Sequence, residues 1–189
     1  LDESAAGAMR RVSPMDIAIS ATRAGRAWFK PHGVMGVLGP YNFPVHLPNG
    51  HIMPALIAGN TIIFKPSEQT PEVAEFTVRL WERAGIPAGV VNLVQGARGP
   101  AEQLVAHDGV DGVLFTGGVP AGRAIHRTLG GRPEKIVALE LGGNNAIIVD
   151  ESADLNLAIP AILFGAVGTA GQRCTTTRRL FVQQSRSEE

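Results

Sequence analysis

The sequence has one cysteine, Cys174, among its 189 residues, so no internal disulfide can form. It has no net charge either, since 17 lysines and arginines balance 17 aspartates and glutamates. Such a balance gives no electrostatic basis for binding nucleic acid or an anionic membrane. No apolar run reaches the roughly 18 residues that a membrane-spanning helix needs. These absences argue against nucleic-acid and membrane partners and fit a reducing compartment such as the cytoplasm.

The first residues, Leu1-Asp2-Glu3-Ser4, include no methionine and none of the basic and apolar regions of a signal peptide. This start suggests either a segment of a longer protein or an unusual gene boundary. Its 44% hydrophobic and 18% charged residues indicate a folded core and argue against disorder. The length is enough for one large domain, or for one domain and part of another.

Short apolar segments that favour strands alternate with helix-compatible segments along most of the chain. The expected strands are 34–38, 61–64, 90–94, 110–115, 135–141, 145–149 and 179–182, and the expected helices are 47–58, 71–84, 101–107, 121–129 and 154–167. The strands are continuous apolar runs, as in a parallel sheet with both faces covered. The alternation predicts an α/β fold with a parallel sheet. Residues 1–30, polar at first and then helical in pattern, stand outside this alternation.

Cys174 follows an apolar, helix-compatible stretch and lies in Ala170-Gly171-Gln172-Arg173-Cys174-Thr175. The adjacent Arg173 favours a thiolate and therefore a nucleophile. Glu140, in Leu139-Glu140-Leu141-Gly142-Gly143, could handle the protons of acyl chemistry. The alternative for the cysteine is a buried structural thiol.

Three turns that follow expected strands carry polar or glycine-rich sequences, where an α/β sheet binds its ligands. In Gly39–Pro44, two prolines stiffen a turn that displays Asn42, either as an oxyanion donor or as a cap of the next helix. In Phe64–Glu68, Lys65 and Glu68 could bind ribose hydroxyls, or could form a surface ion pair. In Phe115–Gly122, glycines could bring backbone amides close to a phosphate, or could serve loop geometry alone.

Other candidate sites are weaker. His46 and His51 lie five residues apart with no further ligand at metal-site spacing, so we expect no metal. An apolar stripe in the last long helix is expected to be its core face; it comprises Ile159, Ile162, Leu163 and Ala166.

The order of these motifs resembles that of the aldehyde dehydrogenase superfamily over residues 32 to 182. The motifs are G-P-Y-N-F-P, K-P-S-E, F-T-G-G-x-x-x-G, L-E-L-G-G-N-N and G-Q-R-C-T. Within the family, K-P-H-G-V, G-P-Y-N-F-P-V-H-L-P-N-G-H-I and A-L-E-L-G-G-N-N resemble the members that oxidise N-succinylglutamate 5-semialdehyde in arginine catabolism.

For catalysis, the resemblance implies that Cys174 attacks an aldehyde substrate to form a thiohemiacetal, which becomes a thioester after hydride transfer. It implies that Glu140 is the general base that activates water to hydrolyse the thioester. Asn42 and the backbone amide of Cys174 match the oxyanion hole.

For the cofactor, the resemblance implies NAD. Lys65 and Glu68 match the ribose-binding pair, and the pyrophosphate turn matches Phe115, Thr116, Gly117 and Gly118. Tyr41 and Gly142 lie in the same motifs and are expected to contribute to cofactor binding. The negative charge of Glu68 would repel a 2′-phosphate, which favours NAD over NADP.

The resemblance also implies a domain division: an N-terminal segment (1–31), an NAD-binding domain (32–139), the start of a second α/β catalytic domain (140–182) and a disordered tail (183–189). The sequence departs from the family at Gly118, where many members carry a serine that reaches the pyrophosphate. It departs in length as well, because family members are more than twice as long and form homo-oligomers. Three possibilities therefore stay open: an aldehyde dehydrogenase, a non-catalytic remnant that binds nucleotide or a partner chain, and a cofactor-free cysteine hydrolase.

Overall fold

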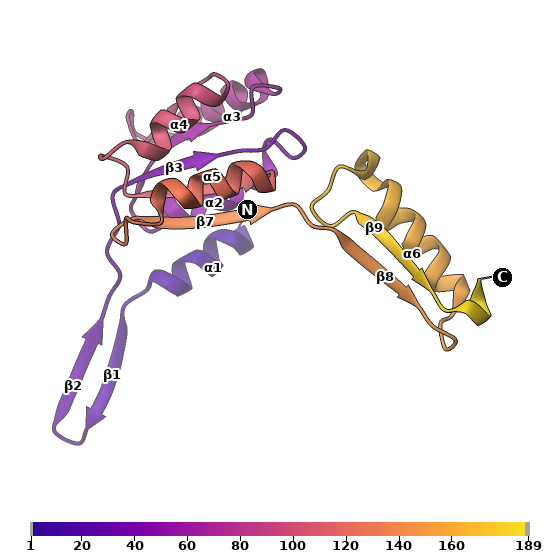
Figure 1. Cartoon of the computed structure of the whole chain (residues 1–189). Helices are drawn as coiled ribbons and strands as arrows, with labels where there is room; N and C mark the ends of the chain where they lie inside the picture. Colours follow the sequence, from indigo (N-terminus) through magenta and orange to yellow (C-terminus); the bar gives the residue numbers. More distant parts are fainter. Residues whose placement is uncertain (1, 188–189) are drawn as a thin grey trace. The chain divides into compact units, whose positions relative to one another are not determined.

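The structure is a computed structural model that describes residues 2–187. The chain divides into two compact units, the first ending at Glu140 and the second beginning at Leu141 (Figure 1). Each unit has its own sheet and is described by itself.

A five-stranded sheet in the order β5-β4-β3-β6-β7 forms the centre of the first unit. Its strands are β3 (Val34–Leu38), β4 (Thr61–Lys65), β5 (Val91–Leu93), β6 (Gly112–Gly117) and β7 (Ile136–Leu141). The pairs β3–β4, β3–β6 and β4–β5 are parallel. At the start of β7, the amide of Ile136 donates to the carbonyl of Asp111, 3.1 Å away, so β6 and β7 begin side by side. The parallel α/β fold predicted from the sequence is confirmed.

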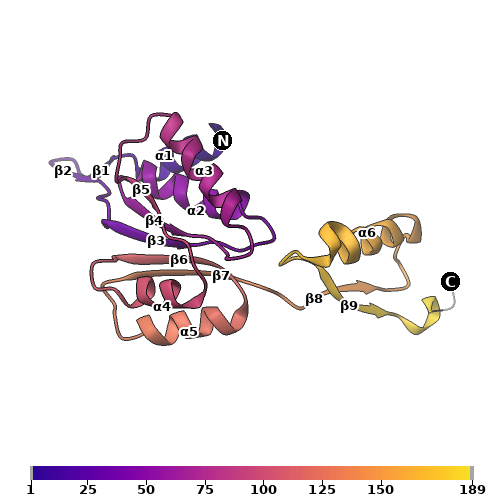
Figure 2. The same cartoon turned by 90° about the horizontal axis from the view of Figure 1, so that it is seen from above.

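Helices cover both faces of this sheet. The helices α2 (His46–Ile57) and α3 (Pro71–Arg83) lie on one face, and α4 (Arg98–Ala106) and α5 (Val119–Leu129) lie on the other (Figure 2). The core lies between α2, α3 and the central strands, and Val37, Ile52, Ile62 and Phe64 are fully buried there. Burial on both faces explains why the strands are continuous apolar runs. The bounds of the predicted elements differ from the observed ones by three residues or fewer.

Two polar side chains, the buried Asn60 and the half-buried Asp111, join the amino ends of the strands. The Asn60 side-chain oxygen accepts hydrogen bonds from the amides of His32 and Gly33, at 2.7 and 3.0 Å. The Asp111 carboxylate accepts one from the amide of Val34 at 2.7 Å. The backbone groups at this end of the sheet are therefore satisfied within the protein.

The chain before the sheet differs from the expectation of a helical segment. After α1 (Asp2–Val12), the strands β1 (Met15–Ser20) and β2 (Arg23–Ala27) form an antiparallel hairpin. In β1, Met15, Ile17 and Ile19 alternate with smaller or polar residues, a period of two that favours a strand. All six residues of β1 are exposed, so no apolar core marks the hairpin.

The second unit is a β-α-β arrangement. The strands β8 (Asn145–Val149) and β9 (Thr177–Val182) are parallel and are connected by α6 (Leu155–Val167) and the 3-10 turn η1 (Gly168–Gly171). Among the described residues, the expected disordered tail includes an ordered 3-10 turn, η2 (Gln184–Arg186), because Arg186 donates to the carbonyls of Glu151 and Ala153. Residues 188–189 of the expected tail lie outside the described part.

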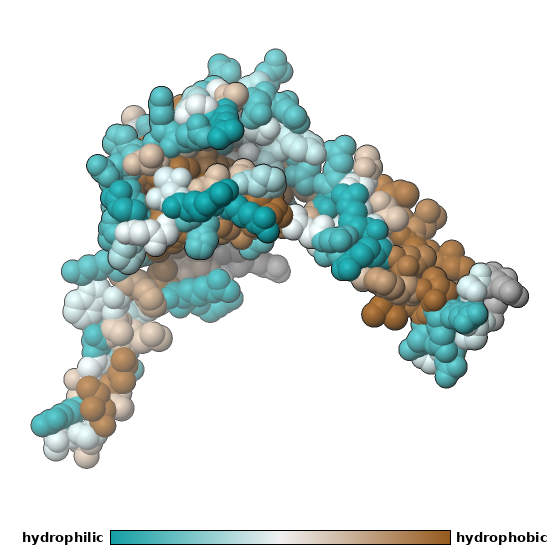
Figure 3. All heavy atoms as spheres, in the orientation of Figure 1, coloured by the Kyte–Doolittle hydropathy of each residue, from teal (hydrophilic) through white to brown (hydrophobic). Residues whose placement is uncertain are grey.

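The prediction that the stripe on α6 is a core face is wrong for two of its members. Ile159 and Leu163 are 57% and 61% exposed, and no residue of α6 is buried. The helix is apolar on most sides, whereas a two-stranded sheet can cover only one of them. Figure 3 shows the result as a continuous hydrophobic surface on this unit.

The close contact between the end of β3 and α2 requires a glycine. A Cβ atom on Gly39 would lie 2.7 Å from Cγ of Pro48 and 3.1 Å from the ring of Phe64. We expect Gly39→Ala to lower the free energy of unfolding by about 1–3 kcal/mol through overpacking, measured by urea denaturation. Gly50→Ala is the matched control: it lies within α2 with no atom within 4 Å of its Cβ position, so it should raise stability by roughly 0.5–1 kcal/mol. Equal stabilities of the two variants would contradict this packing.

Candidate functional site

Three loops leave the first sheet side by side. Leu38, the last residue of β3, pairs with Lys65 at the end of β4 and with Phe115 near the end of β6. The carboxyl ends of these strands therefore share one edge, and this edge carries all three of the turns singled out in the sequence. Ligands bind at such an edge in open α/β sheets.

The first loop holds Asn42 between β3 and α2. The N-cap residue of α2 is Val45, whose side chain makes no capping hydrogen bond, so Asn42 is not the N-cap residue of this helix. Asn42 is half-buried, while the neighbouring Tyr41 is exposed. The side-chain amide of Asn42 has the donors that an oxyanion requires.

The second loop places a buried cation beside an accessible carboxylate. The Lys65 side chain is 7% exposed; its Nζ donates to the carbonyl of Pro66 at 2.7 Å and lies 3.6 Å from Oε2 of Glu68. The Glu68 side chain is 57% exposed. The pair is therefore not the simple surface ion pair considered as an alternative, because its cation is buried. A carboxylate acceptor next to an ammonium donor can bind the hydroxyls of a sugar.

The third loop leads into the amino end of α5. Gly118 is the N-cap residue, no side chain caps the helix, and Pro120 lies in its first turn. Uncapped amides at a helix N-terminus attract phosphate. A Cβ atom on Gly118 would have only Cδ of Pro120 within 4 Å, at 3.7 Å, so this position has room for a side chain.

Glu140, near the end of β7, is exposed and lies at the same edge. Sequence reasoning considered the nearby His51 only as a metal ligand. Its Nε2 lies 3.0 Å from Oγ1 of Thr116. Burial lowers the pKa of His51, and the Glu140 carboxylate opposes this effect. The position of His51 in the sequence gave no indication of its contact with Thr116.

Cys174 belongs to the second unit and is exposed, which excludes the alternative of a buried structural thiol. Its carbonyl accepts a hydrogen bond from the Asn145 side-chain amide at 2.6 Å, and the same amide donates to the carbonyl of Thr176 at 3.1 Å. The buried Thr176 hydroxyl accepts a bond from the amide of Arg173. The backbone around the thiol is thereby held in place. Asn145 was predicted only as the start of a strand, and the signal for its role is the amide pair that follows L-E-L-G-G.

Tight packing and backbone strain surround the cysteine segment. A Cβ atom on Gly143 would lie 2.8 Å from the Asn145 side chain and 3.1 Å from the carbonyl of Cys174, whereas the neighbouring Gly142 is open. Thr169 and Ala170 have φ angles of 56° and 52°, a left-handed conformation that is costly for residues with a side chain.

The Arg173 side chain turns to the helix before it. Its Nε donates to the Thr169 hydroxyl, and its guanidinium lies 5.0 Å from the centre of the Phe164 ring. The positive charge next to Cys174 in the sequence therefore contacts residues of α6 and η1.

The structure brings most of the predicted residues to one edge of the first unit. These are Tyr41, Asn42, Lys65, Glu68, Phe115, Thr116, Gly117, Gly118 and Glu140. The other two, Cys174 and Gly142, lie in the second unit.

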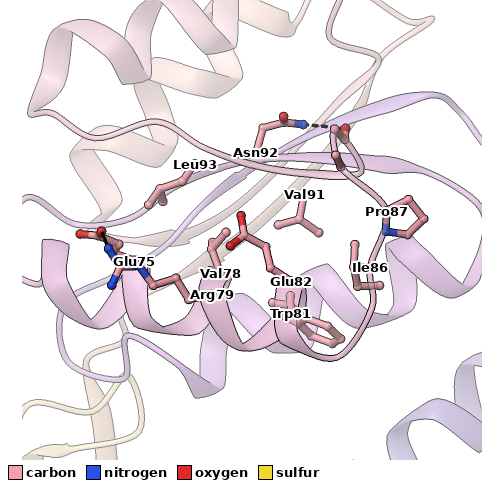
Figure 4. A pocket seen from close by; sticks show the side chains of 12 residues that line it. Glu75, Val78, Arg79, Trp81, Glu82, Ile86, Pro87, Val91, Asn92 and Leu93 are labelled. Carbon is pink, nitrogen blue, oxygen red and sulfur yellow. Dashed lines mark hydrogen bonds and ion pairs between the residues drawn. The ribbon is translucent and has the colours of Figure 1, made fainter.

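A hollow of about 400 Å³ between α3 and β5 includes none of these residues (Figure 4). Three of its polar side chains have partners within the protein: the Asn92 amide donates to the carbonyl of Gly89, and Arg79 pairs with Glu75. This hollow is therefore not the site.

Within residues 2–187, no helix is long and apolar enough to cross a membrane. No group of three or more histidine, cysteine, aspartate or glutamate side chains in the same range is arranged to hold a metal ion.

Comparison with known proteins gives consistent matches. The family model described as the aldehyde dehydrogenase family matches residues 2–189. The chain is 61% identical over 173 residues to an N-succinylglutamate 5-semialdehyde dehydrogenase of Hahella chejuensis, covering 90% of this chain and 34% of that protein. A protein of the same name from Photorhabdus laumondii is 62% identical, with 84% and 33% covered.

Among solved structures, the NAD+ complex of an aldehyde dehydrogenase from Bacillus cereus matches with a TM-score of 0.88 and 36% identity. The match covers 97% of this chain and 38% of that one. The chain thus spans about a third of the length of the curated relatives that it matches. The family model matches nearly every residue of the chain, which belongs to the aldehyde dehydrogenase family.

Proposed function

We propose that this chain carries the NAD-binding domain (32–139) and the start of the catalytic domain (140–182) of an NAD-dependent aldehyde dehydrogenase. The observation that carries the proposal is the shared strand edge, at which Asn42, the Lys65–Glu68 pair and the uncapped amino end of α5 lie together. An amide donor, a ribose-binding pair and a phosphate-binding helix end are the parts that a dinucleotide-dependent oxidation requires.

The proposed substrate is N-succinylglutamate 5-semialdehyde. Two curated relatives with that activity in their names are 61% and 62% identical to the chain. The motifs Lys30-Pro31-His32-Gly33-Val34 and Ala138–Asn145 support the same subgroup. The proposed pathway is arginine catabolism.

The residues of the first unit fit NAD. Lys65 and Glu68 would hold the ribose of the adenosine half, and the turn of Phe115, Thr116, Gly117 and Gly118 with the first turn of α5 would hold the pyrophosphate. Tyr41 in the first unit, and Gly142 in the second, would add further contacts. When bound, the nicotinamide accepts a hydride from the substrate carbon.

The proposed chemistry assigns three roles. The Cys174 sulfur attacks the aldehyde carbon, and the oxygen that becomes negative is stabilised by the Asn42 side-chain amide and the backbone amide of Cys174. After oxidation leaves a thioester, the Glu140 carboxylate takes a proton from the water that attacks it. A nucleophilic thiol must stay reduced, which favours a cytoplasmic location.

A second candidate function is nucleotide binding without turnover. The exposed apolar side chains of α6 favour it; they comprise Leu157, Ile159, Leu163, Phe164 and Val167. An exposed apolar face of five large side chains is ordinarily covered by another part of a protein.

For the complete protein we propose a homo-oligomer, to which the exposed apolar residues of β1 could contribute.

Turnover separates the two functions. The chain mixed with NAD and the semialdehyde should produce NADH, which is measured by its absorbance.

Cys174→Ala should abolish NADH production while leaving NAD affinity unchanged, because only the nucleophile is removed. Glu140→Gln should give a first turnover followed by a slow steady state, because thioester hydrolysis loses its base. NADH production by the cysteine variant would refute the assigned nucleophile, whereas NAD binding without turnover by the unaltered chain would favour the second function.

Cofactor preference tests Glu68. By calorimetry the chain should bind NAD about tenfold or more tightly than NADP, which corresponds to ~1.4 kcal/mol, since the carboxylate repels a 2′-phosphate. Glu68→Gln should lower this ratio of NAD to NADP affinity, and Glu82→Gln, near the end of α3, should leave it unchanged. An equal decrease of the NAD-to-NADP affinity ratio in both variants would show that the net charge of the protein, not the position of Glu68, sets the preference.

Gly118→Ser tests the pyrophosphate turn. The open space at Gly118 admits a hydroxyl, and one additional hydrogen bond is worth about 0.5–1.5 kcal/mol. We expect NAD affinity to rise roughly two- to tenfold. Gly131→Ser is the control, because its Cβ position is open, with no neighbour within 4 Å, and it lies outside the turn. Weaker NAD binding by Gly118→Ser would indicate that the pyrophosphate does not bind at this turn.

A further inference from the structure

The half-buried imidazole of His51 lies at the same strand edge and has no part in the chemistry described above. It is carried by α2, whose contacts in the sheet are with β3, β4 and β6. Its Nε2 contacts the hydroxyl of Thr116, a residue 65 positions later, in the turn proposed to hold the pyrophosphate. This contact therefore connects α2 to the loop that is proposed to bind the cofactor.

We propose that His51 is a positioning residue whose Nε2–H donates to Oγ1 of Thr116 and so directs the Thr116 hydroxyl hydrogen toward an oxygen of the bound dinucleotide. This inference rests on the proposed function. A hydroxyl oxygen can accept one hydrogen bond while its own hydrogen is donated elsewhere. The imidazole thus leaves the hydroxyl as a donor at the edge, and donors in such a chain polarise one another.

The surroundings of the ring fit a neutral donor. Burial favours the uncharged imidazole and lowers the pKa of His51. A neutral ring has one nitrogen that donates and one that accepts. The charged group that acts on it is Glu140 on β7, which works against the burial effect. Lys65 on β4 and Glu68 in the next loop are also charged and lie at this edge; they pair with each other, and Lys65 also donates to the carbonyl of Pro66.

Two substitutions at His51 separate a donor from a space-filling side chain. The glutamine in His51→Gln carries an N–H donor at about the reach of Nε2, whereas His51→Ala has none. By calorimetry with NAD, His51→Ala and Thr116→Val should each weaken binding roughly three- to tenfold, as for one lost hydrogen bond. His51→Gln should stay within about twofold of the unaltered chain. The double variant His51→Ala/Thr116→Val should bind no more weakly than the weaker single variant, because the two groups act as one unit.

His46→Ala is the matched control, since His46 lies on the same helix and is exposed. It should leave NAD affinity unchanged. Binding by His51→Ala as tight as that of the unaltered chain would overturn the proposal. So would a loss in His51→Gln equal to that in His51→Ala, because packing alone would then explain the effect.

A second readout does not need the cofactor. In the 189-residue chain with ¹⁵N-labelled histidine, nuclear magnetic resonance should show His51 protonated at Nε2 at neutral pH, with a pKa below its usual value. Thr116→Val should shift the Nε2 resonance, and Glu140→Gln should lower the pKa further by removing the opposing carboxylate.

An Nδ1–H tautomer would overturn the proposal whatever the binding data. If the unaltered chain fails to bind NAD, the proposed function fails for this chain, and the tautomer alone decides the inference about His51.

Discussion

The parallel register at the end of β3 determines where the candidate site lies. Because Leu38 pairs with Lys65 on one side and with Phe115 on the other, the chain leaves all three strands at the same level. The amino ends are closed by Asn60 and Asp111, whose side chains satisfy backbone amides there. Unsatisfied donors at the carboxyl edge, such as the first amides of α5, remain available to a ligand.

In the second unit, hydrogen bonds hold the backbone around Cys174, which we propose as the nucleophile. The Asn145 amide holds two carbonyls of the cysteine segment, and Gly143 allows the preceding loop to approach the carbonyl of Cys174 closely. The left-handed residues Thr169 and Ala170 turn the chain out of α6 into this segment. Strain at such a position is tolerated because Arg173 donates to the Thr169 hydroxyl and its own amide donates to Thr176, so hydrogen bonds hold Thr169 and the segment that follows.

The sequence predicted the sheet and its edge well, because continuous apolar strands and glycine or proline turns are local signals. Gly39, Asn42 and Glu68 were found from such turns. The β1–β2 hairpin was missed, although Met15, Ile17 and Ile19 alternate in β1, because its strands lack the continuous apolar runs by which the other strands were identified. The core face assigned to α6 was wrong because helical periodicity does not show how much covering surface a unit supplies. His51 and Asn145 contact partners 65 and 29 residues away; the amide pair after L-E-L-G-G was a local signal for Asn145, whereas His51 had none.

The account depends most on the claim that the carboxyl edge of the first sheet is where a dinucleotide binds. Titration of the ¹⁵N-labelled chain with NAD, followed by nuclear magnetic resonance of the backbone amides, tests this directly. We predict shifts confined to the loops after β3, β4 and β6 and to the first turn of α5, with β7 affected near Glu140. Shifts centred on the hollow between α3 and β5, or no shifts at millimolar NAD, would contradict the account.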